Sequence, residues 1–156
     1  GWCFVEGGQW QTGSLTKAPK AECQGAAEEI LEEQEIAVIR AIRGAIQLDV
    51  DEREHLLKST AELLSKTLHA NDIDPAQLIS ILFTATPDIT SEFPALAARE
   101  LGLGDVPLMC FVEMDVKKAM PRVIRVMITA ETNKARGEIQ HVYLRGATAL
   151  RLDLAQ

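Results

Sequence analysis

Long hydrophobic runs, paired cysteines and an excess of basic charge are all missing from this sequence of 156 residues. Its apolar runs are strand-sized, far short of the roughly 20 residues that a membrane-spanning helix needs. Its three cysteines show neither CxxC spacing nor a neighbouring histidine cluster, so neither a disulfide framework nor a structural zinc site is expected. The sequence therefore predicts a soluble, cytoplasmic protein with no membrane partner and no metal.

Basic residues are outnumbered by acidic ones, 16 to 23, which gives a formal net charge of −7. A surface of this sign repels the phosphate backbone, so we expect no nucleic acid partner. An anion that binds this chain must instead be held by a local cluster of cations. The length predicts one domain around a single core.

Residues 1–35 differ in composition from the rest of the chain. Their first part is rich in Gly, Gln, Thr, Ser, Lys and Pro, and it contains no basic region followed by an apolar stretch, so it does not form a secretory signal. We interpret them as an N-terminal leader that is loosely ordered or ends in a short acidic helix, AAEEILEEQE. Residues 36–156 are then the functional domain.

Hydrophobic periodicity predicts that this domain alternates between strands and helices. A helix capped by Asp49 or Asp51 is expected to run to about Asn71, and a shorter helix is expected after Pro94. Strands are expected over Ile36–Ala45 (ended by Gly44), Leu78–Thr86, Val106–Val116 and Val123–Thr129, with one or two more in EIQHVYL and ATALRL. This order predicts an α+β fold, a mixed β-sheet packed by one long and one short helix.

Arg125 is the most unusual residue of the predicted strands. It lies in the middle of RVIRVMIT, where both faces of the strand are apolar, so we expect it to be buried. A guanidinium cannot lose its proton and is rarely buried without a partner, which predicts an anion or lone pair opposite it. Taken singly, other polar residues have ordinary interpretations: Arg43 as a solvated strand end, Cys110 as a small core residue, Glu113 as a surface carboxylate, Tyr143 as a half-buried aromatic and Arg151 as a terminal charge.

Five segments of the domain together resemble a known family. IRAIRGA, LFTATPDITSEFPALAARELG, VPLMCFVEMDV, PRVIRVMIT and HVYLRGATALRLDL are similar, in order and spacing, to the monofunctional trimeric chorismate mutases of the AroH class. The likeness runs from about Ile36 to Leu154. It implies a pseudo-barrel homotrimer with active sites at the subunit interfaces. It also implies an isomerase of aromatic amino-acid biosynthesis that converts chorismate to prephenate by a [3,3]-sigmatropic rearrangement, without a cofactor.

The resemblance also implies roles for individual residues. Arg125 would face the ether oxygen of the substrate, Arg43 and Tyr143 would bind a carboxylate, and Cys110 and Glu113 would hydrogen-bond the ring hydroxyl. Further substrate-binding positions would be Phe93, Ala95, Arg99, Leu108, Met109, Leu150 and Arg151. Leu96 and Met109 depart from the pattern, because a well-known member of the family has a lysine and a threonine there.

Two other classes of function fit a trimeric α+β domain of this size. One is an imine deaminase of the RidA type, which needs a single carboxylate anchor and a positioned water. The other is a non-catalytic sensor that binds metabolites of the aromatic pathway without turnover. The combined set of two arginines, a tyrosine, a cysteine and a glutamate favours the mutase over the deaminase.

Overall fold

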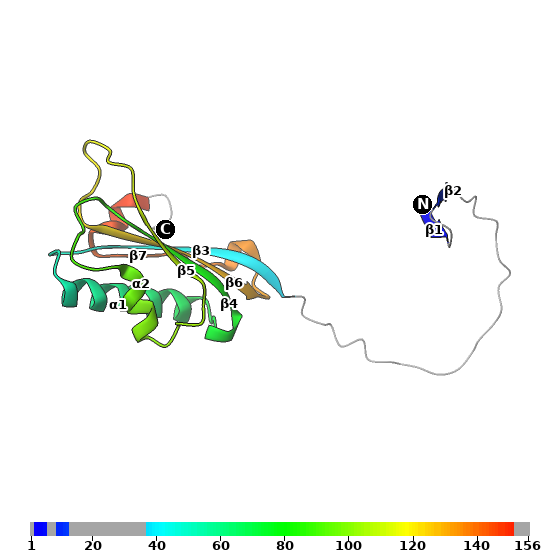
Figure 1. The fold of residues 1–156 in the computed structure, drawn as a ribbon, viewed down its shortest axis with the longest axis horizontal. Coiled ribbons are helices and arrows are strands. Elements are labelled where there is room, and N and C mark those ends of the chain that lie inside the picture. The colour runs from blue at the N-terminus through cyan, green and yellow to red at the C-terminus, as the bar shows by residue number, and fades with distance from the viewer. Residues whose placement is uncertain (1, 6–8, 13–36, 152–156) are drawn as a thin grey trace. The chain divides into compact units, whose positions relative to one another are not determined.

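The computed structural model describes residues 2–5, 9–12 and 37–151. The chain divides into two units, residues 1–34 and residues 35–156. In the first unit, strands β1 (Trp2–Val5) and β2 (Gln9–Thr12) form an antiparallel pair (Figure 1). The segment AAEEILEEQE, for which we predicted a short helix, lies outside the described residues.

The second unit has the α+β fold that the sequence predicted, with a long helix, α1 (Arg53–Ala70), and a short one, α2 (Pro94–Glu100). Its strands are β3 (Val38–Gln47), β4 (Leu78–Ala85), β5 (Leu108–Val112), β6 (Val123–Thr132) and β7 (Val142–Leu144). The 3₁₀ helices are η1 (Pro75–Gln77), η2 (Arg136–Glu138) and η3 (Arg145–Arg151). Among the described residues, no helix is both long and apolar enough to span a bilayer.

The five strands of this unit form one mixed sheet in the order β5-β4-β6-β3-β7. The central strand β6 is antiparallel to both of its neighbours, β4 and β3 (Figure 1). The outer strands are parallel to theirs, β5 to β4 and β7 to β3. Parallel neighbours need a crossover connection, and α2 lies within the one that joins β4 to β5.

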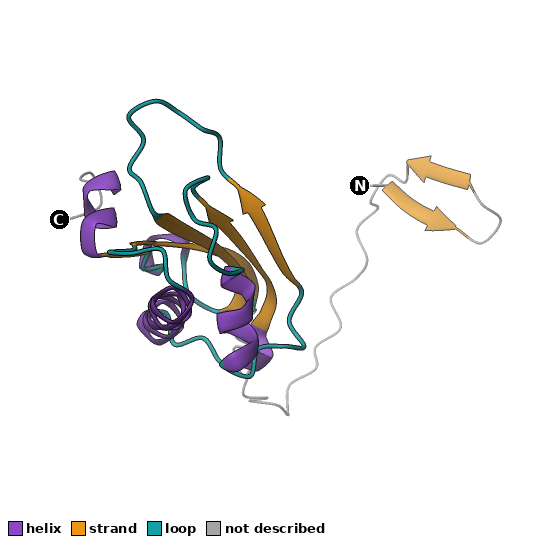
Figure 2. Ribbon diagram, turned by 60° about the vertical axis from the view of Figure 1, so that its left-hand side comes forward, coloured by secondary structure: helices purple, strands orange, loops and turns teal. Residues whose placement is uncertain are grey.

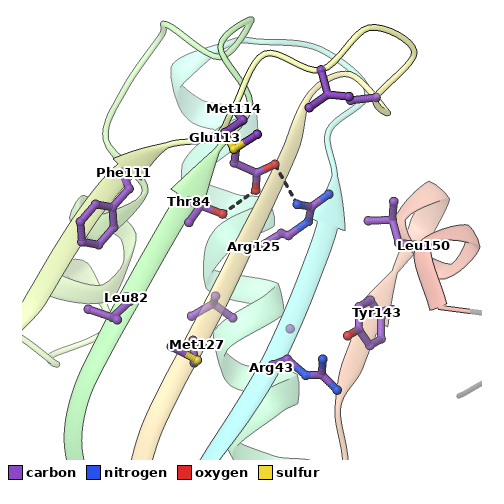
Figure 3. Close-up of a pocket in the computed structure, with 14 residues that line it drawn as sticks. Arg43, Leu82, Thr84, Phe111, Glu113, Met114, Arg125, Met127, Tyr143 and Leu150 are labelled. Atoms are coloured by element: carbon purple, nitrogen blue, oxygen red, sulfur yellow. Dashed lines mark hydrogen bonds and ion pairs between the residues drawn. The ribbon is translucent and has the colours of Figure 1, made fainter.

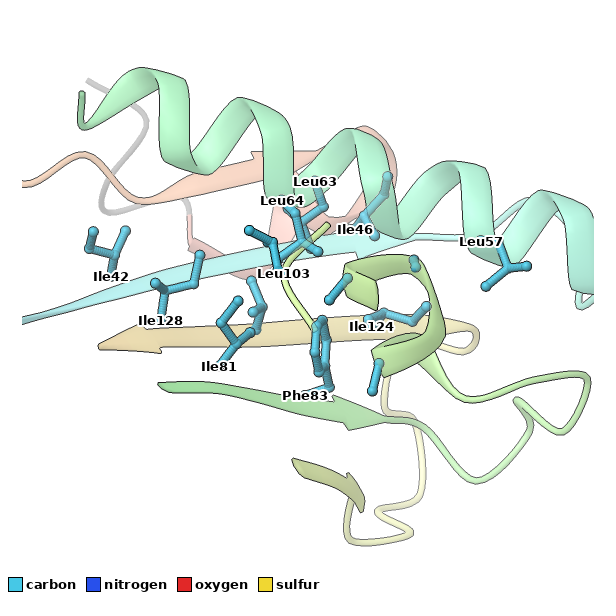
Figure 4. Close-up of a cluster of buried hydrophobic side chains, with 14 of the residues drawn as sticks. Ile42, Ile46, Leu57, Leu63, Leu64, Ile81, Phe83, Leu103, Ile124 and Ile128 are labelled. Atoms are coloured by element: carbon cyan, nitrogen blue, oxygen red, sulfur yellow. The ribbon is translucent and has the colours of Figure 1, made fainter. Parts of the chain in front are cut away.

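Both helices lie on one face of the sheet (Figure 2). The core forms where alternate strand positions meet one side of α1, and it is fully buried (Figure 4). Its largest members include Ile42, Ile46, Ile81, Phe83, Ile124 and Ile128 from the strands and Leu56, Leu63 and Leu64 from α1. Each such side chain contributes about 1.5–3 kcal/mol on burial, so the packing on this face stabilises the sheet.

Neither α1 nor α2 covers the opposite face of the sheet. Met109, Phe111 and Met127 point out from it and are 55%, 45% and 41% exposed. A sheet face that meets only water normally carries polar residues at these alternate positions. We refer to this surface, the side of the sheet away from α1 and α2, as the open face.

Gly44 does not end the first strand of the domain, as we had predicted, because β3 continues to Gln47. A Cβ atom at Gly44 would lie 2.9 Å from Val126 and 3.1 Å from Leu63. The glycine is therefore needed for the close approach of β3 to its neighbours and not for a turn. The prediction of a strand end was wrong for this reason.

The predicted caps of the long helix were also wrong. Helix α1 begins after Glu52, which makes no side-chain cap. The Asp51 carboxylate instead accepts hydrogen bonds from the N–H and hydroxyl groups of Thr90 and Ser91, at 2.7–3.4 Å. Asp49 lies 3.6 Å from the Arg145 guanidinium. Both aspartates therefore serve tertiary contacts, which a local cap signal cannot reveal.

The two C-terminal strand predictions differ from the structure in length and in kind. Within EIQHVYL only Val142–Leu144 forms a strand, and the described part of ATALRL, residues 147–151, lies in the 3₁₀ helix η3. Arg145 has a positive φ of 54°, which turns the chain out of the sheet directly after β7. The third predicted strand is shorter too, because β5 covers only Leu108–Val112.

Candidate active site

A groove of about 790 Å³ lies along the open face of the sheet (Figure 3). Residues from every strand of the sheet and from η3 line it, and most of them are apolar. The lining comprises Arg43, Gly44, Leu82, Thr84, Phe111, Glu113, Met114, Val116, Ala119, Arg125, Val126, Met127, Tyr143 and Leu150. Two cations, one carboxylate and two hydroxyl groups are thus gathered in an otherwise apolar groove.

The strand register places the polar side chains of the groove. Thr84 on β4 is the register partner of Arg125 on β6. On the other side of β6, Arg125 is the partner of Ala45 on β3. Ala45 is in turn the partner of Tyr143 on β7. These four residues therefore form one row across the sheet. Arg43 lies two positions before Ala45 and so points to the same side.

Arg125 forms an ion pair with Glu113. Its Nη1 donates a hydrogen bond to Oε2 of Glu113 at 2.9 Å (Figure 3). We expected Arg125 to be buried, and this was wrong, because the Arg125 side chain is 43% exposed on the open face whereas Glu113 is only 12% exposed. The local sequence could not show this partner, which lies beyond the end of another strand.

Arg43 and Tyr143 lie on the adjacent strands β3 and β7 (Figure 3). The backbone N–H of Arg43 donates to Nδ1 of His141 at 3.0 Å, which ties this part of β3 to the residues just before β7. The Arg43 guanidinium makes no ion pair with any residue that the structure describes. It is available to an anion that enters the groove.

Cys110 and Leu108 face away from the groove. Both pack against the hydrophobic core on the helix-covered side of β5. Burial raises the pKa of the Cys110 thiol, and the Ala95 N–H and the Arg99 charge offset this only in part. The thiol is therefore protonated at neutral pH. Met109 points to the open face but is not part of the groove lining.

The remaining predicted site residues cluster around α2. Phe93 directly precedes the helix and is 69% exposed, Ala95 is buried in its first turn, and Arg99 is exposed in its last turn. Leu150 lines the groove from η3, whereas the side chain of Arg151 lies outside the described residues. Apart from Met109 and Arg151, the structure thus divides the predicted set into two groups. The groove group is Arg43, Glu113, Arg125, Tyr143 and Leu150, and the α2 group is Phe93, Ala95, Arg99, Leu108 and Cys110.

Sequence reasoning missed several residues of the groove, of which Thr84 has the clearest chemistry. Its hydroxyl donates to Oε1 of Glu113 at 2.5 Å. The available signal was weak, because a threonine in the apolar segment LISILFTAT is a common strand residue. Phe111, Met114 and Met127 were missed because their side chains are those of ordinary core residues. Within the described part of the chain, no cluster of three or more His, Cys, Asp or Glu side chains is placed to hold a metal ion.

Comparison with known proteins identifies relatives that span most of this chain. Residues 39–154 match the family model described as chorismate mutase type I. Chorismate mutase AroH of Thermus thermophilus is 45% identical over 118 residues, which are 75% of this chain and 97% of that protein. Chorismate mutase AroH of Bacillus subtilis is 42% identical over 119 residues, 76% of this chain and 94% of that protein. A solved chorismate mutase from Clostridium thermocellum superimposes with a TM-score of 0.70 at 38% identity, covering 70% of this chain and 98% of that one.

Proposed function

This chain belongs to the type I chorismate mutase family and isomerises chorismate to prephenate in aromatic amino-acid biosynthesis, and we propose that the groove on the open face is where the reaction occurs. The observation that carries this proposal is the meeting of Arg43, Glu113, Arg125 and Tyr143 in one groove. These residues come from four separate segments of the chain, and the resemblance assigns each of them to the substrate.

The reaction demands fixed charge more than acid–base chemistry. Chorismate is a dicarboxylate, and breaking its ether C–O bond places growing negative charge on the ether oxygen. A cation aimed at that oxygen stabilises the transition state more than the ground state, which is the condition for catalysis. We assign this role to Arg125, whose guanidinium keeps N–H groups free beyond the one that it donates to Glu113.

Arg43 and Tyr143 are proposed to hold a substrate carboxylate. The Arg43 guanidinium is exposed in the groove with no ion pair among the described residues, and the Tyr143 phenol lies on the neighbouring strand. Holding the carboxylate of the flexible enolpyruvyl arm restricts chorismate to its compact, reactive conformer. Glu113 is proposed to accept a hydrogen bond from the ring hydroxyl, which fixes the way the ring faces.

The energies required are within reach of such a groove. A million-fold acceleration corresponds to about 8 kcal/mol. The loss of one well-placed donor typically costs about 3–4 kcal/mol, so two or three preorganised contacts suffice. The net charge of −7 repels a dianion only weakly, because physiological salt screens charges beyond about 8 Å.

The α2 group is proposed to complete the site of a second copy in a homotrimer. Phe93, Ala95 and Arg99 lie on the helix-covered side of the chain's own sheet, whereas the groove lies on the open face. One chain therefore does not gather all of the predicted residues around one substrate. The exposed apolar side chains of Phe111 and Met127 support burial of the open face by another copy, and the exposed Phe93 supports a contact of α2 with another copy.

The proposal also covers the N-terminal residues and the cellular location. We propose that residues 1–35 form a leader separate from the catalytic domain, supported by the division of the chain at residues 34 and 35 and by a family match that begins at residue 39. We also propose a cytoplasmic location. The unpaired Cys110 and the absence of disulfide spacing support a reducing compartment.

The experiment that tests the groove is a comparison of wild-type protein with Arg125→Ala. Turnover is followed by the loss of chorismate absorbance, and prephenate is then confirmed by its conversion in acid to phenylpyruvate. We expect turnover by the wild type and none above background by the variant, with the oligomeric state unchanged. Undiminished turnover by Arg125→Ala would contradict the assignment of the groove. Binding of chorismate without turnover by the wild type would point to a sensor.

A further inference from the structure

The Glu113 carboxylate is held at both of its oxygens by two different strands. Oε2 accepts from Nη1 of Arg125 on β6 at 2.9 Å, and Oε1 accepts from the hydroxyl of Thr84 on β4 at 2.5 Å (Figure 3). The Glu113 side chain is 12% exposed. Each oxygen thus has its own donor, and the carboxylate is largely shielded from water.

The backbone fixes this arrangement further. The N–H of Glu113 donates to the carbonyl oxygen of Ala85 at 2.9 Å, so Glu113 begins next to the end of β4. Thr84 is the residue before Ala85 and the register partner of Arg125. The glutamate therefore reaches across the end of β4 to an arginine on β6, and its other oxygen meets the hydroxyl of Thr84 on β4.

This geometry keeps the ion pair monodentate. An arginine and a carboxylate usually prefer two parallel hydrogen bonds, one from each of two guanidinium nitrogens. Here Oε1 accepts from the Thr84 hydroxyl, and only Oε2 accepts from Arg125. The other N–H groups of the Arg125 guanidinium then stay available to the groove.

We propose that Thr84 is a positioning residue for the mutase reaction. It acts through Glu113, by orienting the carboxylate so that a single oxygen, Oε2, meets Arg125, which leaves more of the guanidinium to the substrate. The inference rests on the proposed function, because it requires Arg125 to act on the substrate. Without Thr84, the resting site would trap Arg125 in a bidentate pair that the substrate must break.

The ordinary alternative is that Thr84 is present only because a β-branched residue suits a strand. Valine satisfies that requirement equally well and has nearly the same shape, but it lacks the hydroxyl. Thr84→Val therefore removes the proposed donor and leaves the strand intact. Thr84→Ser does the reverse, since it keeps the hydroxyl and loses a methyl group.

The test is a double-mutant cycle between Thr84→Val and Glu113→Ala, with kcat and KM measured for each variant. A hydrogen bond to a charged group corresponds to roughly a tenfold effect or more, so we expect kcat of Thr84→Val to fall about tenfold with a smaller change in KM. Thr84→Ser should stay within about threefold of wild type by the same reasoning, because its donor remains. In the Glu113→Ala background, Thr84→Val should have no further effect.

Thr129→Val is the matched control, because Thr129 lies on β6 on the same side as Arg125, outside the groove lining. We expect it to leave kcat unchanged. The inference is overturned if Thr84→Val matches wild type, or if it lowers kcat equally with and without Glu113, as a purely structural effect would. If instead Arg125→Ala remains active, the proposed function fails before Thr84 is in question.

Discussion

Gly44 on β3 and Val126 on β6 are register partners that approach too closely for any side chain at position 44. A Cβ atom there would lie 2.9 Å from Cγ1 of Val126 and 3.1 Å from Oγ1 of Thr67. We expect Gly44→Ala to lower the free energy of unfolding by about 1–3 kcal/mol through overpacking. Denaturant unfolding at equal protein concentration measures this.

Gly104→Ala is the matched control for that change, because no atom lies within 4 Å of the position that its Cβ would take. Its free energy of unfolding should stay within about 0.5 kcal/mol of wild type. Equal stability of the two variants would show that the contact between β3 and β6 relaxes without cost. Gly44 would then have no packing role.

The shape of the guanidinium at position 125 should matter as much as its charge. Arg125→Lys keeps a cation near Glu113, but an ammonium group is a compact point charge that cannot serve several acceptors in one plane. We expect kcat to fall at least about a hundredfold, as for the loss of a well-placed donor, with no change in oligomeric state. Steady-state kinetics and analytical ultracentrifugation provide the two measurements.

Arg136→Lys serves as the control for the same exchange, since Arg136 is exposed in η2 and takes no part in the groove. It should leave kcat unaffected. A lysine at position 125 that keeps kcat within about tenfold of wild type would end the role of Arg125 at the ether oxygen, because the loss of one well-placed donor typically costs more than that.

The prediction of the fold succeeded where local patterns are unambiguous. Short apolar runs rich in β-branched residues predicted β4 and β6, and the periodic leucines and Pro94 predicted the two helices. Prediction failed where a residue serves a distant partner. Asp51 has the features of a helix cap, yet its hydrogen bonds go to Thr90 and Ser91, about 40 positions along the chain.

The site was harder to predict than the fold, because strand register brings its residues together. Thr84 and Arg125 face each other only because β4 pairs with β6 in one particular alignment, which neither segment specifies alone. The resemblance to a family supplied Arg43, Glu113, Arg125 and Tyr143, but it could not reveal Thr84. The pairing of Arg125 with Glu113 likewise required the three-dimensional structure.

Asp51 should make stability depend on pH in the acid range. Burial alone would raise the pKa of Asp51, but hydrogen bonds from Ser91 and Thr90 outweigh it, so the pKa lies below its ordinary value. A carboxylate with a lower pKa when folded stabilises the protein above the unfolded pKa of about 4 and loses this contribution as the pH falls through the folded value. Asp51→Asn should therefore cost about 1 kcal/mol at pH 7 and less near pH 3.

Unfolding at equal protein concentration at the two pH values measures this difference, with Asp105→Asn as the control. Asp105 is exposed, and no hydrogen bond to its side chain is found in the described residues. Its replacement should be neutral at both pH values. A cost for Asp51→Asn that is the same at pH 7 and pH 3 would mean that the carboxylate charge contributes nothing to the contact.

Turnover should be insensitive to pH near neutrality and to solvent deuterium. The rearrangement transfers no proton, and burial raises the pKa of the Cys110 thiol, so that the thiol does not ionise in this range. We expect kcat to be constant between about pH 6 and pH 8, because the thiol keeps the same protonation state across this range. A solvent isotope effect well above unity on chemistry-limited turnover would contradict a purely pericyclic step.

Two inactive variants should restore activity when they are combined in the proposed homotrimer. Arg125→Ala disables the groove group, and the double variant Phe93→Ala/Arg99→Ala disables the α2 group on the other side of the sheet. If each site joins the groove of one chain to the α2 group of its neighbour, random mixing leaves about a quarter of the sites with both groups intact. Turnover of mixed trimers, prepared by refolding the two variants together, measures this fraction.

The matched control is a mixture of Arg125→Ala with Arg43→Ala. Both changes lie in the groove group, so every site in such a trimer has one defective groove whichever chains adjoin. This mixture should stay as inactive as its components. Restored turnover in the first mixture alone would mean that adjacent chains share the site, whereas no recovery at any mixing ratio would place each site within a single chain. The exposure of Phe93 would then need another explanation.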